Sequence, residues 1–130
     1  MDDIYREIIL DHFKNPRNFG KIKNPDAQAV ENNPFCGDKI EMQIKLKVHK
    51  VIKSKVIEDI RFSGEGCAIS TASASMLTER VMGRNIEEIQ KLNTEDILKM
   101  LGISLTPTRL KCALLPLEVI HKTLVLIKDK

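Results

Sequence analysis

The stretch Ile40-Glu41-Met42-Gln43-Ile44-Lys45-Leu46-Lys47-Val48 decides the fold class, because apolar and polar residues alternate along it without a break. A period of two predicts a β-strand with one face on the core and the other in water. A second strand is expected from Val56 to Phe62, joined to the first as an antiparallel hairpin by the basic segment Lys50 to Lys55. A further short strand is expected near Ala27 to Val30.

Helical patterns lie on both sides of these strands. Apolar residues recur at helical spacing near the N-terminus and predict an amphipathic helix that ends at Asn15-Pro16, with an apolar face made of Ile4, Ile8, Ile9 and Phe13. After the strands, start and stop signals predict four helices, which are expected from Cys67 to Gly83, from Asn85, from Asn93, and from Pro107 to about Ile127.

This order of elements indicates one α+β domain covering residues 1–130, with helices on one face of a small antiparallel sheet of about three strands. Pro116 lies inside the last predicted helix and should kink it, because a proline cannot donate to the carbonyl of Cys112.

The composition of the chain argues against nucleic-acid and membrane partners. The chain has 130 residues, 42% of them hydrophobic, which suits a single core, and its net charge of +3 is spread along its length. The basic segment Lys45 to Lys55 lacks interleaved aromatic residues, so a solvated hairpin face is expected rather than a nucleic-acid surface. There is no signal peptide pattern and no apolar run near about 18 residues, so a cytoplasmic protein without a membrane partner is expected.

The three cysteines are the candidates for chemistry. They form an odd set without a CxxC pair, which argues against a disulfide framework and leaves metal binding, thiol chemistry or inert buried thiols open. Cys36, Cys67 and Cys112 each fall near the boundary of a predicted element, and Asp38 follows Cys36 with only Gly37 between them. Three thiolates and a carboxylate would make a four-ligand site for zinc or an iron-sulfur cluster. An aspartate in the position of Asp38, taken alone, is more often a solvated turn residue or a hydrogen-bond cap.

Four segments together resemble a known family, the U-type iron-sulfur cluster scaffold proteins IscU, SufU and the N-terminal domain of NifU. The resemblance covers nearly the whole chain, and the segments that carry it are DHFKNPRNFG (11–20), NPFCGD (33–38), GEGCAISTASASML (64–77) and TRLKCALLPLEVI (108–120). It implies the SufE/NifU-like α+β fold.

The resemblance also implies a site and a function. Cys36, Asp38, Cys67 and Cys112 would surround one centre, and the three cysteines are the candidate sulfur acceptors. The protein would accept persulfide sulfur from a cysteine desulfurase of the IscS, SufS or NifS type, with iron and electrons from other donors. It would build a transient [2Fe-2S] cluster and pass it to recipient apo proteins, as a scaffold rather than an enzyme, and as a monomer or homodimer.

Three departures from the family pattern keep alternatives open. Lys111 stands before the last cysteine, as in SufU, where IscU proteins have histidine, so Lys111 is given a thiolate-tuning role. The insertion of roughly twenty residues usual in SufU is absent, and Leu105 to Arg109 matches the Hsp70-recruiting motif poorly, which makes chaperone-driven release doubtful. The alternatives are a zinc-containing SufU-like sulfurtransferase partner of a desulfurase and a zinc-stabilised interaction domain.

Overall fold

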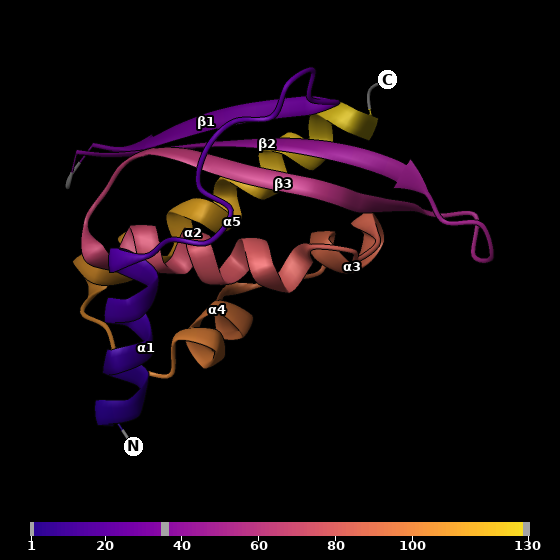
Figure 1. Cartoon of the computed structure of the whole chain (residues 1–130). Helices are drawn as coiled ribbons and strands as arrows, with labels where there is room; N and C mark the ends of the chain where they lie inside the picture. The colour runs from indigo at the N-terminus through magenta and orange to yellow at the C-terminus, as the bar shows by residue number, and fades with distance from the viewer. Residues whose placement is uncertain (1, 35–36, 129–130) are drawn as a thin grey trace.

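The computed structural model describes residues 2–34 and 37–128, and it has the predicted α+β architecture (Figure 1). Three strands follow the first helix and four helices follow the strands. The elements in chain order are α1 (Asp2–Lys14), β1 (Ala27–Asn33), β2 (Asp38–Val48), β3 (Lys55–Glu65), α2 (Ala68–Val81), α3 (Ile86–Gln90), α4 (Thr94–Leu101) and α5 (Pro107–Lys128).

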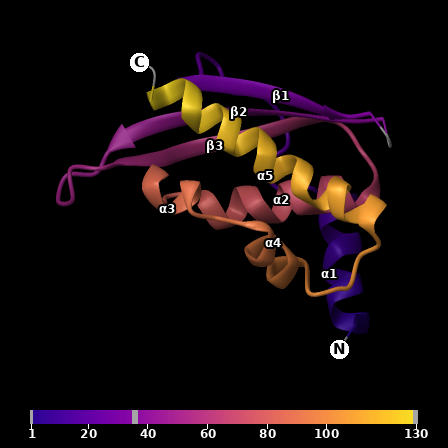
Figure 2. The same ribbon diagram turned by 180° about the vertical axis from the view of Figure 1, so that it is seen from behind.

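The strands form an antiparallel meander in the order β1-β2-β3. All the helices lie on one side of this sheet, with α2 and α5 crossing beneath it and α1 and α4 further out (Figures 1 and 2). The predicted alternation along β2 is confirmed, because its even-numbered apolar residues face this helical layer. The largest fully buried side chains are Phe62, Ile40, Met42, Ile44, Ile57, Ile60, Leu77, Ile89, Ile97, Leu101, Leu115 and Ile120.

The helix boundaries follow the capping signals in the sequence. Asn93 and Asp96 form a reciprocal capping box at the start of α4, and Asn85 caps α3 by accepting from the Glu88 N–H. α5 begins at Pro107 and is helical through Pro116; the kink at Pro116 stays a prediction. None of the helices in the described residues is long and apolar enough to cross a membrane.

The predicted apolar face of α1 is only partly buried. Of its residues, Ile9 is buried as expected, but Ile4 is 65% exposed and Phe13 40% exposed, and the polar His12 is buried. The buried His12 makes a polar contact with α2, and an apolar pattern cannot reveal a polar contact.

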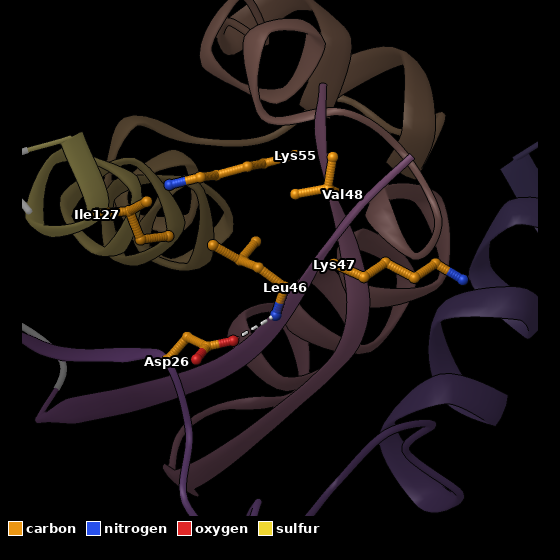
Figure 3. A pocket seen from close by; sticks show the side chains of 6 residues that line it. All are labelled: Asp26, Leu46, Lys47, Val48, Lys55 and Ile127. Atoms are coloured by element: carbon orange, nitrogen blue, oxygen red, sulfur yellow. Dashed lines mark hydrogen bonds between the residues drawn. The ribbon is translucent and has the colours of Figure 1, made fainter. Parts of the chain in front are cut away.

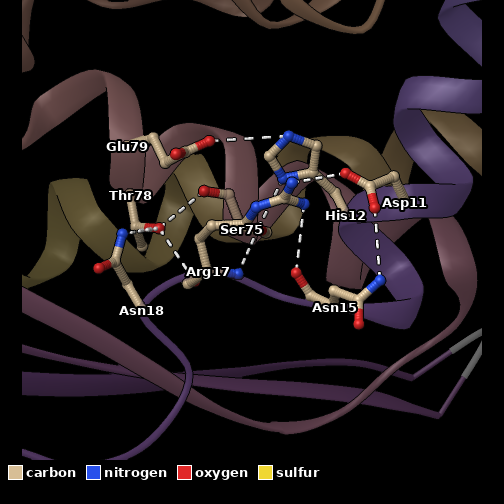
Figure 4. Close-up of polar contacts among 8 residues, drawn as sticks. All are labelled: Asp11, His12, Asn15, Arg17, Asn18, Ser75, Thr78 and Glu79. Carbon is tan, nitrogen blue, oxygen red and sulfur yellow. Dashed lines mark hydrogen bonds and ion pairs between the residues drawn. The ribbon is translucent and has the colours of Figure 1, made fainter.

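That polar contact joins α1 to the middle of α2 (Figure 4). His12 Nδ1 lies 2.7 Å from Ser75 Oγ, and the Arg17 backbone N–H donates to the same oxygen at 2.8 Å. Asn18 Nδ2 donates to Thr78 Oγ1 at 3.1 Å one turn further along α2. A neutral His12 that accepts the Ser75 hydroxyl proton at Nδ1 satisfies both groups, and its other nitrogen then faces Glu79 at 3.6 Å.

This contact should make stability depend on pH. Burial, with the Arg17 charge as a second cause, lowers the pKa of His12 below its usual 6.5. His12 therefore becomes protonated near pH 6.5 in the unfolded chain but only at a lower pH in the folded chain. The contribution of His12 to the free energy of unfolding should be fully present above pH 6.5. It should fall as the pH drops below 6.5, by at most about 1.4 kcal/mol per pH unit for one proton.

Urea unfolding between pH 7.5 and 5.5 tests this dependence on His12. The His12→Gln variant carries no titrating ring, so its stability relative to the wild type should improve as the pH falls. A difference between the two proteins that stays constant across this range would contradict the assignment. Asp11 does not interfere, because its ion pair with Arg17 lowers its pKa further below the ordinary 3.8, outside the tested window.

Candidate functional site

Asp38 lies at the first position of β2 and is buried, being only 2% exposed. Gly37 before it has a φ of 73°, a left-handed conformation that favours glycine and turns the chain into the strand. The Asp38 Oδ1 atom accepts the backbone N–H of Cys67 at 2.9 Å. The reading of Asp38 as a solvated turn residue is therefore wrong, and its carboxylate is built into the junction between β2 and α2.

Cys67 is the N-cap residue of α2, as the sequence predicted, and it is partly exposed. Its Sγ lies 3.8 Å from Asp38 Oδ2. The helix N-terminus supplies a positive dipole end that favours a thiolate or another anion at this position. Asp38 and Cys67, 29 residues apart in sequence, thus meet through both a backbone and a side-chain contact.

Cys112 reaches the same place from α5 but is completely buried, at 0% exposure. The end of β1 lies beside it, and Asn33 Nδ2 lies 3.8 Å from Cys112 Sγ, which suits an amide donor to sulfur.

Asn33 is a site residue that reasoning from sequence missed. It is buried, with 5% exposure, as the last residue of β1. No local pattern in the sequence could have identified it, because the thiol that it contacts, Cys112, lies 79 positions further along the chain.

Together Asp38, Cys67 and Cys112 offer three ligand atoms within 4.8 Å of one another. In a tetrahedral zinc site, a thiolate sulfur at about 2.3 Å and a carboxylate oxygen at about 2.1 Å are about 3.6 Å apart, close to the 3.8 Å between Cys67 Sγ and Asp38 Oδ2. Thiolates also hold iron-sulfur clusters, so the donor set fits either centre.

Two of the predicted site residues lie outside this group. Cys36 falls outside the described residues, so its place in the site stays a prediction. Lys111 is exposed on α5 and borders a surface hollow of about 180 Å³ that Asn33 and Pro34 also line. It lies next to the site, and its tuning role stays a prediction.

Among known protein families, residues 4–130 match the one described as NifU-like N terminal domain. The chain belongs to this family. It is 37% identical over 139 residues to the zinc-dependent sulfurtransferase SufU of Bacillus subtilis, covering 94% of this chain and 90% of that protein. It is 41% identical over 125 residues to the iron-sulfur cluster assembly scaffold protein IscU of Aquifex aeolicus, covering 96% of this chain and 74% of the relative.

A crystal structure gives the same fold. It is of a candidate iron-sulfur cluster assembly scaffold protein for the SUF system from Fervidobacterium islandicum. That structure superposes with a TM-score of 0.78 at 28% identity, covering 94% of this chain and 97% of the other. The U-type scaffold family and its α+β fold, both expected from sequence, are therefore confirmed.

Proposed function

We propose that this protein is a scaffold on which an iron-sulfur cluster is assembled from delivered sulfur and iron and then passed to recipient proteins. The observation that supports this most is the meeting of two thiols and a buried carboxylate within 4.8 Å. Cys36 is proposed as the remaining ligand, which would give three thiolates and the carboxylate of Asp38. A carboxylate oxygen binds these centres less tightly than a thiolate, which suits a site that releases its cargo.

Sulfur would enter by thiol-persulfide exchange. A thiolate of this chain attacks the outer sulfur of a desulfurase persulfide, the S–S bond there breaks, and the desulfurase thiolate leaves. Of the two described thiols, Cys67 is the accessible one, because Cys112 is fully buried. An electron donor supplies the electrons that reduce persulfide sulfur to sulfide. The cysteine desulfurase, the donors of iron and electrons, and a cytoplasmic location are all part of this proposal.

A second function is supported by the same geometry. A zinc ion would be held by the same four residues, Cys36, Asp38, Cys67 and Cys112, and one ligand would exchange when a desulfurase docks, so that the freed thiolate accepts sulfur. When bound, zinc keeps its thiol ligands deprotonated. The presence of Lys111 before the last cysteine, as in SufU, favours this alternative.

Metal and sulfide analysis separates the two functions. After anaerobic purification and reconstitution with iron, sulfide and reductant, the scaffold function predicts iron and acid-labile sulfide in equal amounts. Cys67→Ser and Cys112→Ser should each reduce both by more than about tenfold, since a serine oxygen is a poor ligand for either iron or zinc. His49→Gln, on the remote hairpin, is the control and should change neither. Tightly bound zinc, no cluster after reconstitution and stimulation of a desulfurase would establish the sulfurtransferase instead.

A further inference from the structure

The far end of the sheet has an open strand edge. β1 begins at Ala27, which pairs with Ile44, whereas β2 continues to Val48. From Lys45 to Val48, β2 pairs with β3 through a β-bulge and has no second strand beside it among the described residues. One segment of β2 therefore presents an edge on the side where β1 is missing.

The backbone of this edge points outward. The Leu46 N–H donates sideways to Asp26 Oδ2 at 2.7 Å, on the side of β1. The His49 N–H points to the opposite side, toward β3, and donates to the Ser54 carbonyl across the hairpin. Because strand residues alternate in direction, the N–H and C=O of Val48 face the same outer side as Leu46. The Leu46 N–H is already bonded to Asp26, so it is the N–H and C=O of Val48 that are placed to pair with another strand.

The two faces of this edge differ in chemistry (Figure 3). Toward the helices lies a groove of about 330 Å³ whose lining is apolar at Leu46, Val48 and Ile127 and charged at Asp26 and Lys55. On the opposite face lie Lys45 and Lys47, and Figure 3 shows Lys47 pointing away from the groove. A strand laid along this edge would put alternate side chains into this groove and beside two lysines.

Charge decides which strand can lie there. Five lysines and no acidic residue occur from Lys45 to Ile57. Lysines on an edge strand prevent pairing with a second copy of the same strand, because like charges would lie opposite each other. The same lysines favour a strand that carries carboxylates.

We propose that the end of β2 binds an extended segment of a partner protein in which acidic and apolar residues alternate. The segment adds to the sheet as a strand beside Leu46 to Val48, with its apolar side chains in the groove and its carboxylates beside Lys45 and Lys47. The Val48 side chain is 60% exposed and becomes more buried when the groove is filled.

This surface is remote from the thiols. β2 runs from Asp38 in the site to Val48 at the edge, and eleven residues of strand span about 33 Å. A partner anchored here leaves Cys67 accessible and raises its own concentration near the site. The inference rests on the edge, the groove and the lysines, and it holds whichever centre the thiols bind.

The test uses the full chain and a synthetic peptide, acetyl-Val-Glu-Val-Glu-Val-Glu-Val-amide. Nuclear magnetic resonance titration should shift the amide signals of Leu46 to Val48 and leave that of Cys67 unchanged. Affinity should fall about tenfold or more between low and high salt, because the carboxylates meet exposed lysines. Alternate N–H groups of the extended peptide point to opposite sides, and only one of these two sets pairs with β2. N-methylation of that set should abolish binding, whereas N-methylation of the other set should preserve it.

Matched charge variants locate the contact. Lys45→Glu with Lys47→Glu should weaken binding more than about tenfold, with Lys47→Gln as a milder variant should the double change impair folding. Lys50→Glu with Lys53→Glu changes the charge equally but lies in the turn, and it should have a much smaller effect. Equal losses in the two doubles, or indifference to amide methylation, would overturn the proposal. So would binding to phosphatidylglycerol-containing vesicles without binding to the peptide, which would assign the hairpin to a lipid surface.

Discussion

Replacing Asp38 with alanine should lengthen the lifetime of a bound cluster about tenfold, the factor that about 1.4 kcal/mol in a barrier gives. The Asp38 carboxylate is the one oxygen ligand proposed beside thiolates. Because it is the weaker ligand, it is the one that a competing thiol should displace first. The decay of the cluster absorbance after adding a chelator or an apo acceptor measures this lifetime. A cluster that is lost at the same rate or faster would contradict the role of Asp38 in release.

A control separates ligation from structure, because Asp38 also accepts the Cys67 N–H at 2.9 Å. Asp38→Asn keeps an acceptor oxygen at this position but removes the carboxylate charge. If release depends on the carboxylate, Asn and Ala should slow it alike. Alanine alone leaves a buried N–H without its acceptor, so it should also cost about 1–3 kcal/mol of folding stability.

Replacing Gly64 with alanine should destabilise the protein by about 3 kcal/mol or more and lower its melting temperature by about 10 °C. Gly64 has a φ of 131° and lies opposite Ile40 on β2. A Cβ there would collide with the carbonyl group of Lys39, which is backbone and cannot move aside. Because Lys39 follows Asp38, the displaced strand should also weaken metal or cluster binding. Urea unfolding and metal content measure the two effects.

Gly20 provides the matched control for this substitution. Its φ of 136° is nearly the same, but a Cβ at Gly20 would meet nothing within 4 Å. Gly20→Ala should therefore show the conformational cost alone, about 1–3 kcal/mol, with metal binding retained. Equal losses at the two positions would mean that the approach of β3 to β2 is not what requires glycine at Gly64.

Local signals predicted most of the fold. The alternation in β2, the Asn93 capping box and Pro107 at the start of α5 each act through neighbouring residues, so they are readable in sequence. The orientation of α1 was not readable, because the hydrogen bond between His12 and Ser75 joins residues 63 positions apart. Its apolar pattern suggested another face, which the structure leaves partly exposed.

The site was predicted only in part for a related reason. The spacing of the cysteines could not show that Cys67 and Cys112 meet, since only the packing of α2 and α5 under the sheet brings them together. The resemblance to a family placed Cys36, Asp38, Cys67 and Cys112 around one centre. The structure brings the ligand atoms of Asp38, Cys67 and Cys112 within 4.8 Å of one another, and that these residues bind a centre stays a prediction. Asn33 lay outside that reasoning because its contact with Cys112 depends on where β1 ends above α5.

The three ligand atoms come from the start of β2, the N-cap of α2 and the interior of α5, so a bound centre would act as a cross-link between distant segments. Such a cross-link stabilises the folded chain by an amount that grows with affinity and ligand concentration. The same linkage means that a change in the fold alters the affinity of the site for its metal or cluster. A partner that moved α5 away from α2 would separate Cys112 from Asp38 and lower this affinity without contacting a ligand residue. Local unfolding of α5 would then be enough to release the bound centre.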